Sequence, residues 1–200
     1  LIGIPITYGE YIRMKKIKLG LVAAVLLASV SGSALATEVG KFYGAIDVGQ
    51  STLNGFCDAA AGAATCEETD VAFRGAVGYQ VMPNLAVEAG YGSYGTATAT
   101  GGGLTVDGEV TSFQVSAVGS YPVADAFSVT GKLGLAMSTF KATATFGGAS
   151  ASLEDDSTDV VLGVGVLYNI NQSVGLRAQW ETIANDDAVD LLSAGVVFNF

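Results

Sequence analysis

The chain has 200 residues, of which half are hydrophobic, 14% are charged and 27 are glycine. A soluble domain usually has about 25% charged residues and roughly 7% glycine, so this composition fits neither an ordinary cytosolic enzyme nor a disordered chain. The net charge of −10 argues against nucleic acid as a partner, and the absence of histidine removes the commonest general base and metal ligand.

The N-terminal part predicts a leader. Residues 14–18 are basic, residues 19–30 form an apolar run, and residues 34–36 place small side chains where a signal peptidase reads them. This order predicts a cleavable signal peptide over residues 14–36, because a transmembrane helix needs about 20 apolar residues and serine and glycine interrupt this run earlier. We interpret residues 1–13 as translated sequence upstream of the true start.

The remaining residues, 37–200, predict one all-β domain by their length and pattern. Apolar residues alternate strictly with small or polar ones in eight stretches, which is the period of half-buried strands. The stretches are 42–49, 71–80, 85–92, 112–121, 127–136, 160–168, 174–181 and 192–200.

The two faces of these strands differ in an informative way. One face of each strand is apolar and carries no charge, whereas the other is built from glycine, alanine, serine and a few ionisable residues. A solvent-facing surface would carry bulkier polar side chains, as a soluble barrel or sandwich requires. The interior of an eight-stranded barrel has room only for side chains that fill it. We therefore predict apolar faces toward lipid and small polar faces toward a lumen.

The connections alternate in length. Three are tight and contain turn-forming residues, and those between them are mostly longer. This alternation predicts an eight-stranded antiparallel up-and-down outer-membrane β-barrel with short periplasmic turns, longer external loops and both termini in the periplasm. The tight connections lie near 82–84, 122–125 and 169–172, and the others cover roughly 50–69, 95–108, 140–158 and 183–187.

With this pattern the chain resembles the barrel of the OmpA family and its small relatives of the OmpX and opacity-protein type. The stretches from Phe42 to Gly49, Gly75 to Gln80 and Leu85 to Tyr91 carry the resemblance. It extends to the barrel without a peptidoglycan-binding domain, so it does not imply anchoring to the cell wall. The last strand is similar to the signal that the barrel-assembly machinery of Gram-negative bacteria reads, with Leu192, Ala194, Val196, Phe198 and Phe200 on one face.

The predicted inward face carries three acids and three bases. Isolated buried charges are costly, whereas paired ones are tolerated. We favour a salt-bridge network that plugs the lumen over a gate whose pairs exchange partners and open a narrow ion path. The six residues are Asp47, Arg74, Glu88, Lys132, Arg177 and Glu181.

The two cysteines, Cys57 and Cys66, both fall in the first long loop. The periplasm is oxidising, so we predict a disulfide between them, and their spacing without histidine does not suit zinc. Acidic residues gather in the loops, for example at 154–156. We interpret them as a solvated surface rather than as a site for divalent cations that bridge to lipopolysaccharide or for a basic partner.

Together these features predict a non-enzymatic, OmpA-like outer-membrane barrel with a structural or surface-interaction role, such as membrane integrity or adhesion. The alternative is a small gated porin or transporter for ions or small solutes. An outer-membrane enzyme is disfavoured because many such enzymes use histidine. We expect no catalytic residue, metal or cofactor. The expected partners are outer-membrane lipid, lipopolysaccharide, the assembly machinery, periplasmic chaperones and an external ligand or host surface at the acidic loops, with the barrel itself monomeric.

Overall fold

The structure is a computed structural model that describes residues 39–59, 64–184 and 188–200. The predicted signal peptide and residues 1–13 lie outside the described residues. Of the two compact units into which the chain divides, the second, 32–200, contains the whole sheet.

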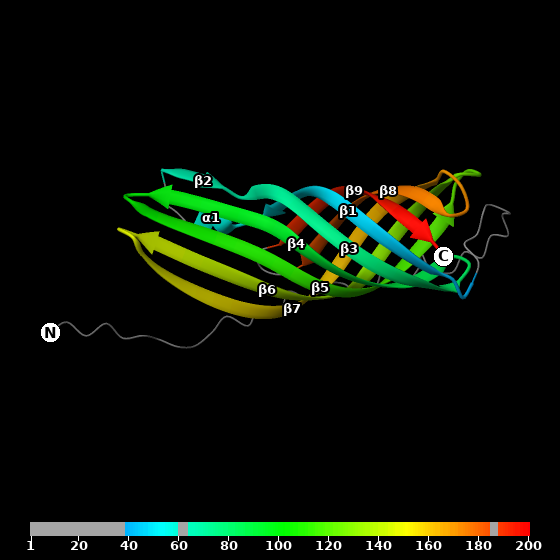
Figure 1. Ribbon diagram of the computed structural model, residues 1–200, viewed down its shortest axis with the longest axis horizontal. Coiled ribbons are helices and arrows are strands. Elements are labelled where there is room, and N and C mark those ends of the chain that lie inside the picture. The colour runs from blue at the N-terminus through cyan, green and yellow to red at the C-terminus, as the bar shows by residue number, and fades with distance from the viewer. Residues whose placement is uncertain (1–38, 60–63, 185–187) are drawn as a thin grey trace, which may run out of the picture. The chain divides into compact units, whose positions relative to one another are not determined.

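Within the described residues, eight long strands form the sheet, and a short helix and a short strand lie in the first loop (Figure 1). No helix in this part of the chain is long and apolar enough to cross a membrane. In chain order the elements are β1 (Phe42–Leu53), α1 (Phe56–Ala59), β2 (Thr65–Glu67), β3 (Thr69–Met82), β4 (Leu85–Gly101), β5 (Leu104–Pro122), β6 (Phe127–Phe146), β7 (Ala149–Asn169), β8 (Val174–Ala184) and β9 (Val189–Asn199).

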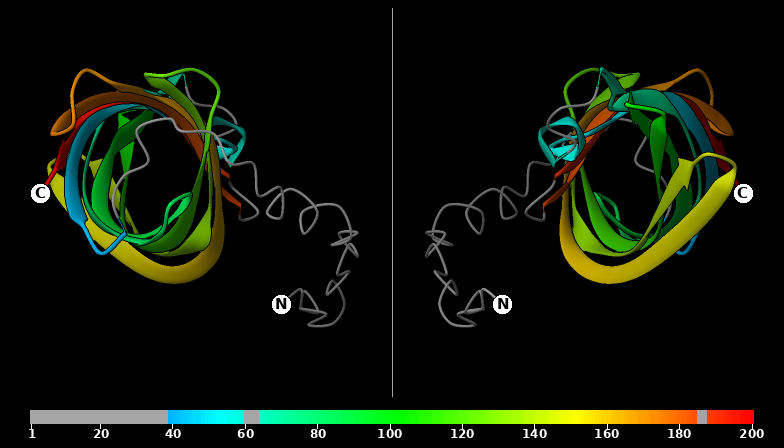
Figure 2. Two further views of the ribbon diagram at one scale, coloured as in Figure 1. Left: turned by 90° about the vertical axis from the view of Figure 1, so that its right-hand side faces the viewer. Right: turned by 90° about the vertical axis from the view of Figure 1, so that its left-hand side faces the viewer.

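The sheet closes on itself. Each long strand pairs antiparallel with the next long strand along the chain, and β1 pairs with β9 from Tyr43 opposite Asn199 to Leu53 opposite Val189. The predicted eight-stranded antiparallel barrel is therefore confirmed, and Figure 2 shows it along its axis. The start of β1 and the end of β9 lie at the same end as the three tight turns, which we call the turn end. The opposite end is the loop end.

Side chains alternate between the outside and the lumen as the sequence pattern predicts. Outward residues such as Ile46 are large, apolar and exposed, in this case 67% exposed. Inward residues such as Ala72, Ala136 and Val161 are buried. The barrel therefore presents apolar side chains on its outer surface, and such a surface is stable in lipid rather than in water.

The prediction of long loops is wrong at two places, where the structure has β-hairpins instead. The stretch near 95–108 is the paired ends of β4 and β5, and the stretch near 140–158 is the paired ends of β6 and β7. Each hairpin turns through two glycines with positive φ, Gly102-Gly103 and Gly147-Gly148. A two-residue turn of this kind needs positive φ at both central positions, which glycine adopts without strain.

A β-bulge in β4 breaks the alternation of apolar and polar residues, so the sequence pattern did not predict the first of these hairpins. The register of β4 shifts between Ser93 and Thr96, and Gly95 has a φ of 75°. The extra residue moves the inward positions from even to odd numbers, so that Tyr94 and then Ala97 face inward. The alternation therefore breaks in the middle of a continuous strand.

The strands are unequal in length. On one side β4 pairs with β3 only as far as Ser93, and on the other β7 pairs with β8 only from Val160. The ends of β4, β5, β6 and β7 therefore continue beyond the closed barrel as an open, curved sheet, visible on the left of Figure 1. We call this part the protruding sheet. The short strand β2 pairs with its β4 margin, from Thr65 opposite Thr100 to Glu67 opposite Thr98.

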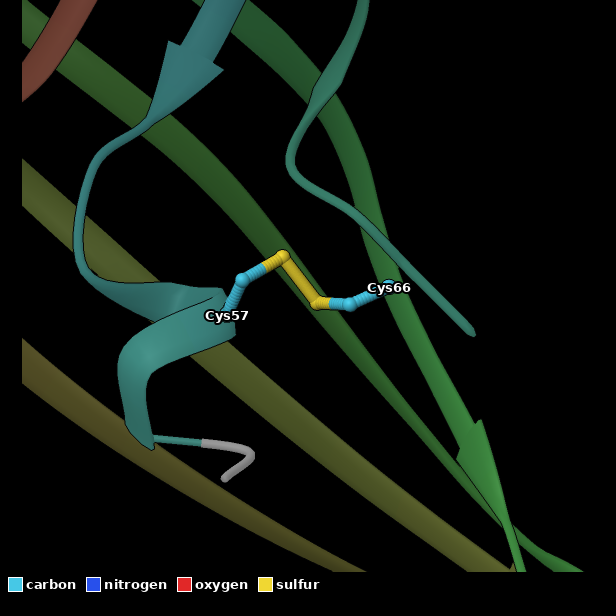
Figure 3. The surroundings of a disulfide bond; sticks show 2 residues. All are labelled: Cys57 and Cys66. Carbon is cyan, nitrogen blue, oxygen red and sulfur yellow. A yellow bond between two sulfur atoms is a disulfide. The ribbon is translucent and has the colours of Figure 1, made fainter. Parts of the chain in front are cut away.

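The first loop contains the predicted disulfide between Cys57, in α1, and Cys66, in β2 (Figure 3). The sequence pattern predicted neither α1 nor β2. Both are only three or four residues long, too short for a periodic signal.

Two glycines on opposite faces of β6 predict opposite effects of one substitution. A Cβ at Gly134 would lie 2.4 Å from the carbonyl oxygen of Val115, whereas a Cβ at Gly131 would meet nothing within 4 Å. We expect Gly134→Ala to lower the free energy of unfolding by about 1–3 kcal/mol through overpacking. Gly131→Ala should leave it unchanged or raise it by about 0.5 kcal/mol. Urea unfolding of both variants in lipid vesicles measures the difference, and equal destabilisation would contradict the inward assignment of Gly134.

Candidate functional site

The structure places all six predicted inward charges in the lumen. They come from five strands: Asp47 from β1, Arg74 from β3, Glu88 from β4, Lys132 from β6, and Arg177 and Glu181 from β8. Each occupies an inward register position, and their side chains are at most 10% exposed. The alternation of the strands thus brings together groups that are far apart in the sequence.

Asp47 is held by two arginines, Arg74 from the neighbouring strand β3 and Arg177 from β8, which lies on the far side of β9. Arg74 donates from Nε and Nη2 to Oδ2 of Asp47 at 3.2 and 3.1 Å. Arg177 donates from Nε to Oδ1 at 2.6 Å and from Nη2 to Oδ2. This carboxylate therefore lies between two guanidinium groups, each of which contacts it through two nitrogens.

Glu88 and Glu181 join the bases across the lumen. Glu88 contacts Arg74 Nη1 and Lys132 Nζ, each at 3.2 Å, and Arg177 Nη1 at 2.8 Å. Glu181 contacts Lys132 Nζ at 3.0 Å and Arg74 Nη1 at 3.4 Å. Every acid thus contacts at least two bases, and the six groups form one connected network rather than three separate pairs.

Neutral side chains complete this network. The hydroxyl of Tyr43 donates to Glu88 at 3.0 Å, and the hydroxyl of Tyr94 donates to Glu181 at 3.1 Å. Gln114 donates from Nε2 to Glu181 at 3.2 Å and accepts from Lys132 at 3.5 Å. We did not predict these three as site residues. Tyr43 and Gln114 share the inward register with the charges, which is the signal that could have identified them, whereas Tyr94 follows the end of the predicted stretch 85–92.

The network lies between two apolar layers. The layer at the turn end consists of Tyr43, Ala45, Ala76, Ala86 and Val197, with Leu167 against it. The layer at the loop end is larger, with Phe56 and Phe140 packed against it. Its members are Leu53, Ala72, Tyr94, Ala97, Val110, Ala136, Val161, Ile183, Val189 and Leu191.

A cavity of about 80 Å³ adjoins the network on the turn side. Glu88, Lys132, Arg177 and Glu181 line its inner part, and Gln80, Ser120, Thr130 and Asn199 line it nearer the turns. This volume is enough for several water molecules, which the charged and polar groups of the lining could hydrogen-bond. Tyr43, Ala86, Leu167 and Val197 of the turn-end layer also line it, so this cavity has both polar and apolar walls, whereas the loop side of the network is an apolar layer.

The remaining predicted site residues lie elsewhere. On β9, Leu192, Ala194 and Phe198 are exposed and face outward, Val196 is partly buried in the same register, and exposed Phe200 follows the strand. Among the described residues, no group of three or more Cys, Asp or Glu side chains is arranged to hold a metal ion.

Comparison with known proteins gives one family and one fold. The model of the family described as the OmpA-like transmembrane domain matches residues 37–200. No curated protein matches the chain.

Several solved barrels share its fold. The attachment invasion locus protein Ail of Yersinia pestis is 20% identical, with a TM-score of 0.55, and the match covers 82% of this chain and all of that one. Ail has also been solved with the heparin analogue sucrose octasulfate. Neisserial surface protein A is 18% identical, with a TM-score of 0.58, over 80% of this chain and 97% of that one. The N-terminal barrel domain of OprF from Pseudomonas aeruginosa is 14% identical, with a TM-score of 0.52, over 82% of this chain and all of that one.

Removing one acid from the network should be far more costly than removing one from the surface. Glu88→Gln leaves three buried bases with two acids, so we expect the free energy of unfolding to fall by about 3–5 kcal/mol. The matched control, Glu154→Gln on the exposed part of β7, should leave it unchanged. Adding Lys132→Met to Glu88→Gln restores the charge balance, so the double variant should lose less stability than the two single variants summed. Equilibrium unfolding in urea measures the parent, the single variants Glu88→Gln, Lys132→Met and Glu154→Gln, and the double variant, and strict additivity would contradict a coupled network.

Proposed function

The chain belongs to the OmpA-like transmembrane domain family of eight-stranded outer-membrane barrels, and from this premise we propose that it is a closed structural barrel that displays a binding surface outside the cell. In this proposal the turn end, with the start of β1 and the end of β9, faces the periplasm. The protruding sheet faces the exterior of the cell. Lipid and lipopolysaccharide contact the apolar outer faces. The barrel-assembly machinery and periplasmic chaperones handle the chain before insertion. The proposal assigns no catalytic role.

The filled lumen supports a closed barrel rather than a pore. A conducting path would have to cross the ion network, in which each carboxylate already contacts at least two bases. It would then have to cross the apolar layer of the loop end, where ions lose their hydration without gaining partners. Breaking the network alone therefore does not create a polar path from end to end.

The open margin of the protruding sheet is the observation that carries the surface-interaction role. Residues 149–159 of β7 pair with β6 on one side, and among the described residues no strand pairs with them on the other. An unpaired strand edge offers backbone donors and acceptors to another polypeptide, which adds to the sheet as a further strand. A closed barrel has no such edge, so the unpaired edge is confined to the protruding sheet.

The chemistry of this margin favours a basic, extended partner. Glu154, Asp155, Asp156 and Asp159 lie along it, and the inward row of the same sheet exposes Phe146 and Leu153, at 62% and 80%. A segment that alternates basic and apolar residues matches both faces. The acidic margin disfavours a polyanionic partner, because like charges repel. In this it would differ from Ail, which has been solved with a polyanion, the heparin analogue. The same acids also repel a second copy of the edge, which agrees with a monomer.

A planar bilayer separates the closed barrel from the gated pore. We expect the refolded residues 37–200 to give no discrete conductance steps, and Glu88→Ala and Arg74→Ala to remain silent because the apolar layer persists. Folding is checked by the difference in gel mobility between unheated and boiled protein. Discrete openings that change in either variant would favour the gated pore instead.

A peptide-binding experiment tests the open margin. The probe is a synthetic peptide with alternating lysine and valine, titrated against the folded barrel at low and at high salt. We expect Glu154→Gln/Asp155→Asn/Asp156→Asn to weaken binding by roughly tenfold or more, because charge complementarity at the margin is lost. The matched control, Asp58→Asn/Glu67→Gln/Glu68→Gln, removes the same charge from the first loop. Equal weakening by both triple variants would show nonspecific attraction and contradict a site at the margin.

A further inference from the structure

The first loop is tied to the barrel on the β9 side. The backbone N–H of Asn54 donates to the carbonyl of Ala188 at 3.1 Å. Its side chain donates from Nδ2 to the same carbonyl at 2.7 Å and to Oδ2 of Asp190 at 2.9 Å. Asn54 thus fixes the direction in which the chain leaves β1.

The same loop is tied to the protruding sheet on the β4 side. Cys66 lies opposite Ala99 in the pairing of β2 with β4, and the N–H of Ala64 donates to the carbonyl of Thr100 at 2.8 Å. The disulfide joins Cys66 to Cys57 in α1, as Figure 3 shows. The residue before Cys57 is therefore held between two anchors, Asn54 and the disulfide.

That residue is Phe56, and its ring reaches the far wall of the barrel. Phe56 follows β1, yet it lies on the inward face of β5 at Gly108 beside Phe140 of β6. In the ring of strands β6 is opposite β1, with three strands between them in either direction. The loop therefore lies across the loop end of the lumen, with an aromatic ring at its far side.

Gly108 provides the space for this ring. A Cβ at position 108 would lie 2.7 Å from Cε2 of Phe56 and 3.1 Å from Cε2 of Phe140. Its neighbour across the strands, Ala97, lies in the protruding sheet, beyond the bulge of β4, where an inward side chain would otherwise face solvent. Ala97 is nevertheless 0% exposed, and Val110, the next inward residue of β5, is buried. The ring of Phe56 packs over this apolar layer.

We propose that Phe56 is a stopper that seals the apolar layer at the loop end of the lumen, and that the Cys57–Cys66 bond is the staple that holds it there. The seal is redox-sensitive. A dithiol reductant supplies two electrons and two protons, the S–S bond breaks into two thiols, and the reductant becomes a cyclic disulfide. The anchor at Asn54 remains, but Phe56 is then held on one side only. This inference concerns access to the lumen and does not depend on the partner proposed for the protruding sheet.

Thiol labelling tests the seal directly. A reporter, Ala97→Cys, is introduced into the folded, oxidised barrel and exposed to a charged maleimide that does not cross the bilayer. The same reporter is placed in two further backgrounds, Cys57→Ser/Cys66→Ser and Phe56→Ala with the disulfide intact. Ser152→Cys, on the exposed part of β7, is the control for reagent access, and mass spectrometry of the unreduced protein checks that Cys57 and Cys66 remain paired where both are present.

We expect the reporter to react roughly ten- to a hundredfold faster in both backgrounds than in the oxidised parent, because either the ring or the constraint on it is lost. The Ser152→Cys rate should be the same in all three. Equal Ala97→Cys rates in the parent and the double-serine background would overturn the staple. A slow rate in Phe56→Ala, with the fold confirmed by gel mobility, would overturn the stopper.

Discussion

The hydrogen bonds between β1 and β9 are the constraint on which the rest of the structure depends. A strand in lipid cannot leave its backbone groups unpaired, so a sheet that spans a membrane must close. Closure with eight strands leaves an interior only wide enough for side chains. The sequence therefore has to fill that interior with glycine, alanine and serine, with apolar groups at its two ends and with charges only where they balance one another.

The balanced charges work as a network because of what burial costs. Taking a single carboxylate or ammonium group out of water costs more than one ion pair usually returns. Here every acid contacts at least two bases, and Tyr43, Tyr94 and Gln114 add hydrogen bonds to Glu88 and Glu181. The cost of taking each acid out of water is thus offset by several favourable contacts and not by a single ion pair. The same multiplicity makes the arrangement rigid, since no base can leave one acid without leaving a buried charge underpaired.

The strands and their two faces could be predicted from the sequence because a period of two is unambiguous while the strand continues. The inward position of all six charges follows from that period. Which charges meet could not be predicted, because Lys132 and Glu88 come from strands that are not neighbours, and their approach depends on the stagger and tilt of the closed barrel. The hairpin of β4 and β5 was mistaken for a loop because the bulge at Gly95 interrupts the alternation. The hairpin of β6 and β7 was mistaken for one because residues 149–159 carry a single large apolar side chain, Leu153, and so show no apolar alternation. The place of Phe56 could not be predicted either, since α1 is four residues long.

The two ends of the barrel differ for one reason, the unequal length of its strands. At the turn end all strands finish together, the connections are tight and a cavity adjoins the network. At the loop end four strands continue past their neighbours, so their inward residues lose the opposite wall. The chain replaces that wall near the barrel with Phe56, whose ring covers Gly108 and Phe140. Farther out nothing among the described residues covers Phe146 and Leu153, and no described strand pairs with residues 149–159 of β7 on the side away from β6. The surface that the fold leaves incomplete is therefore also the one that we propose binds another polypeptide.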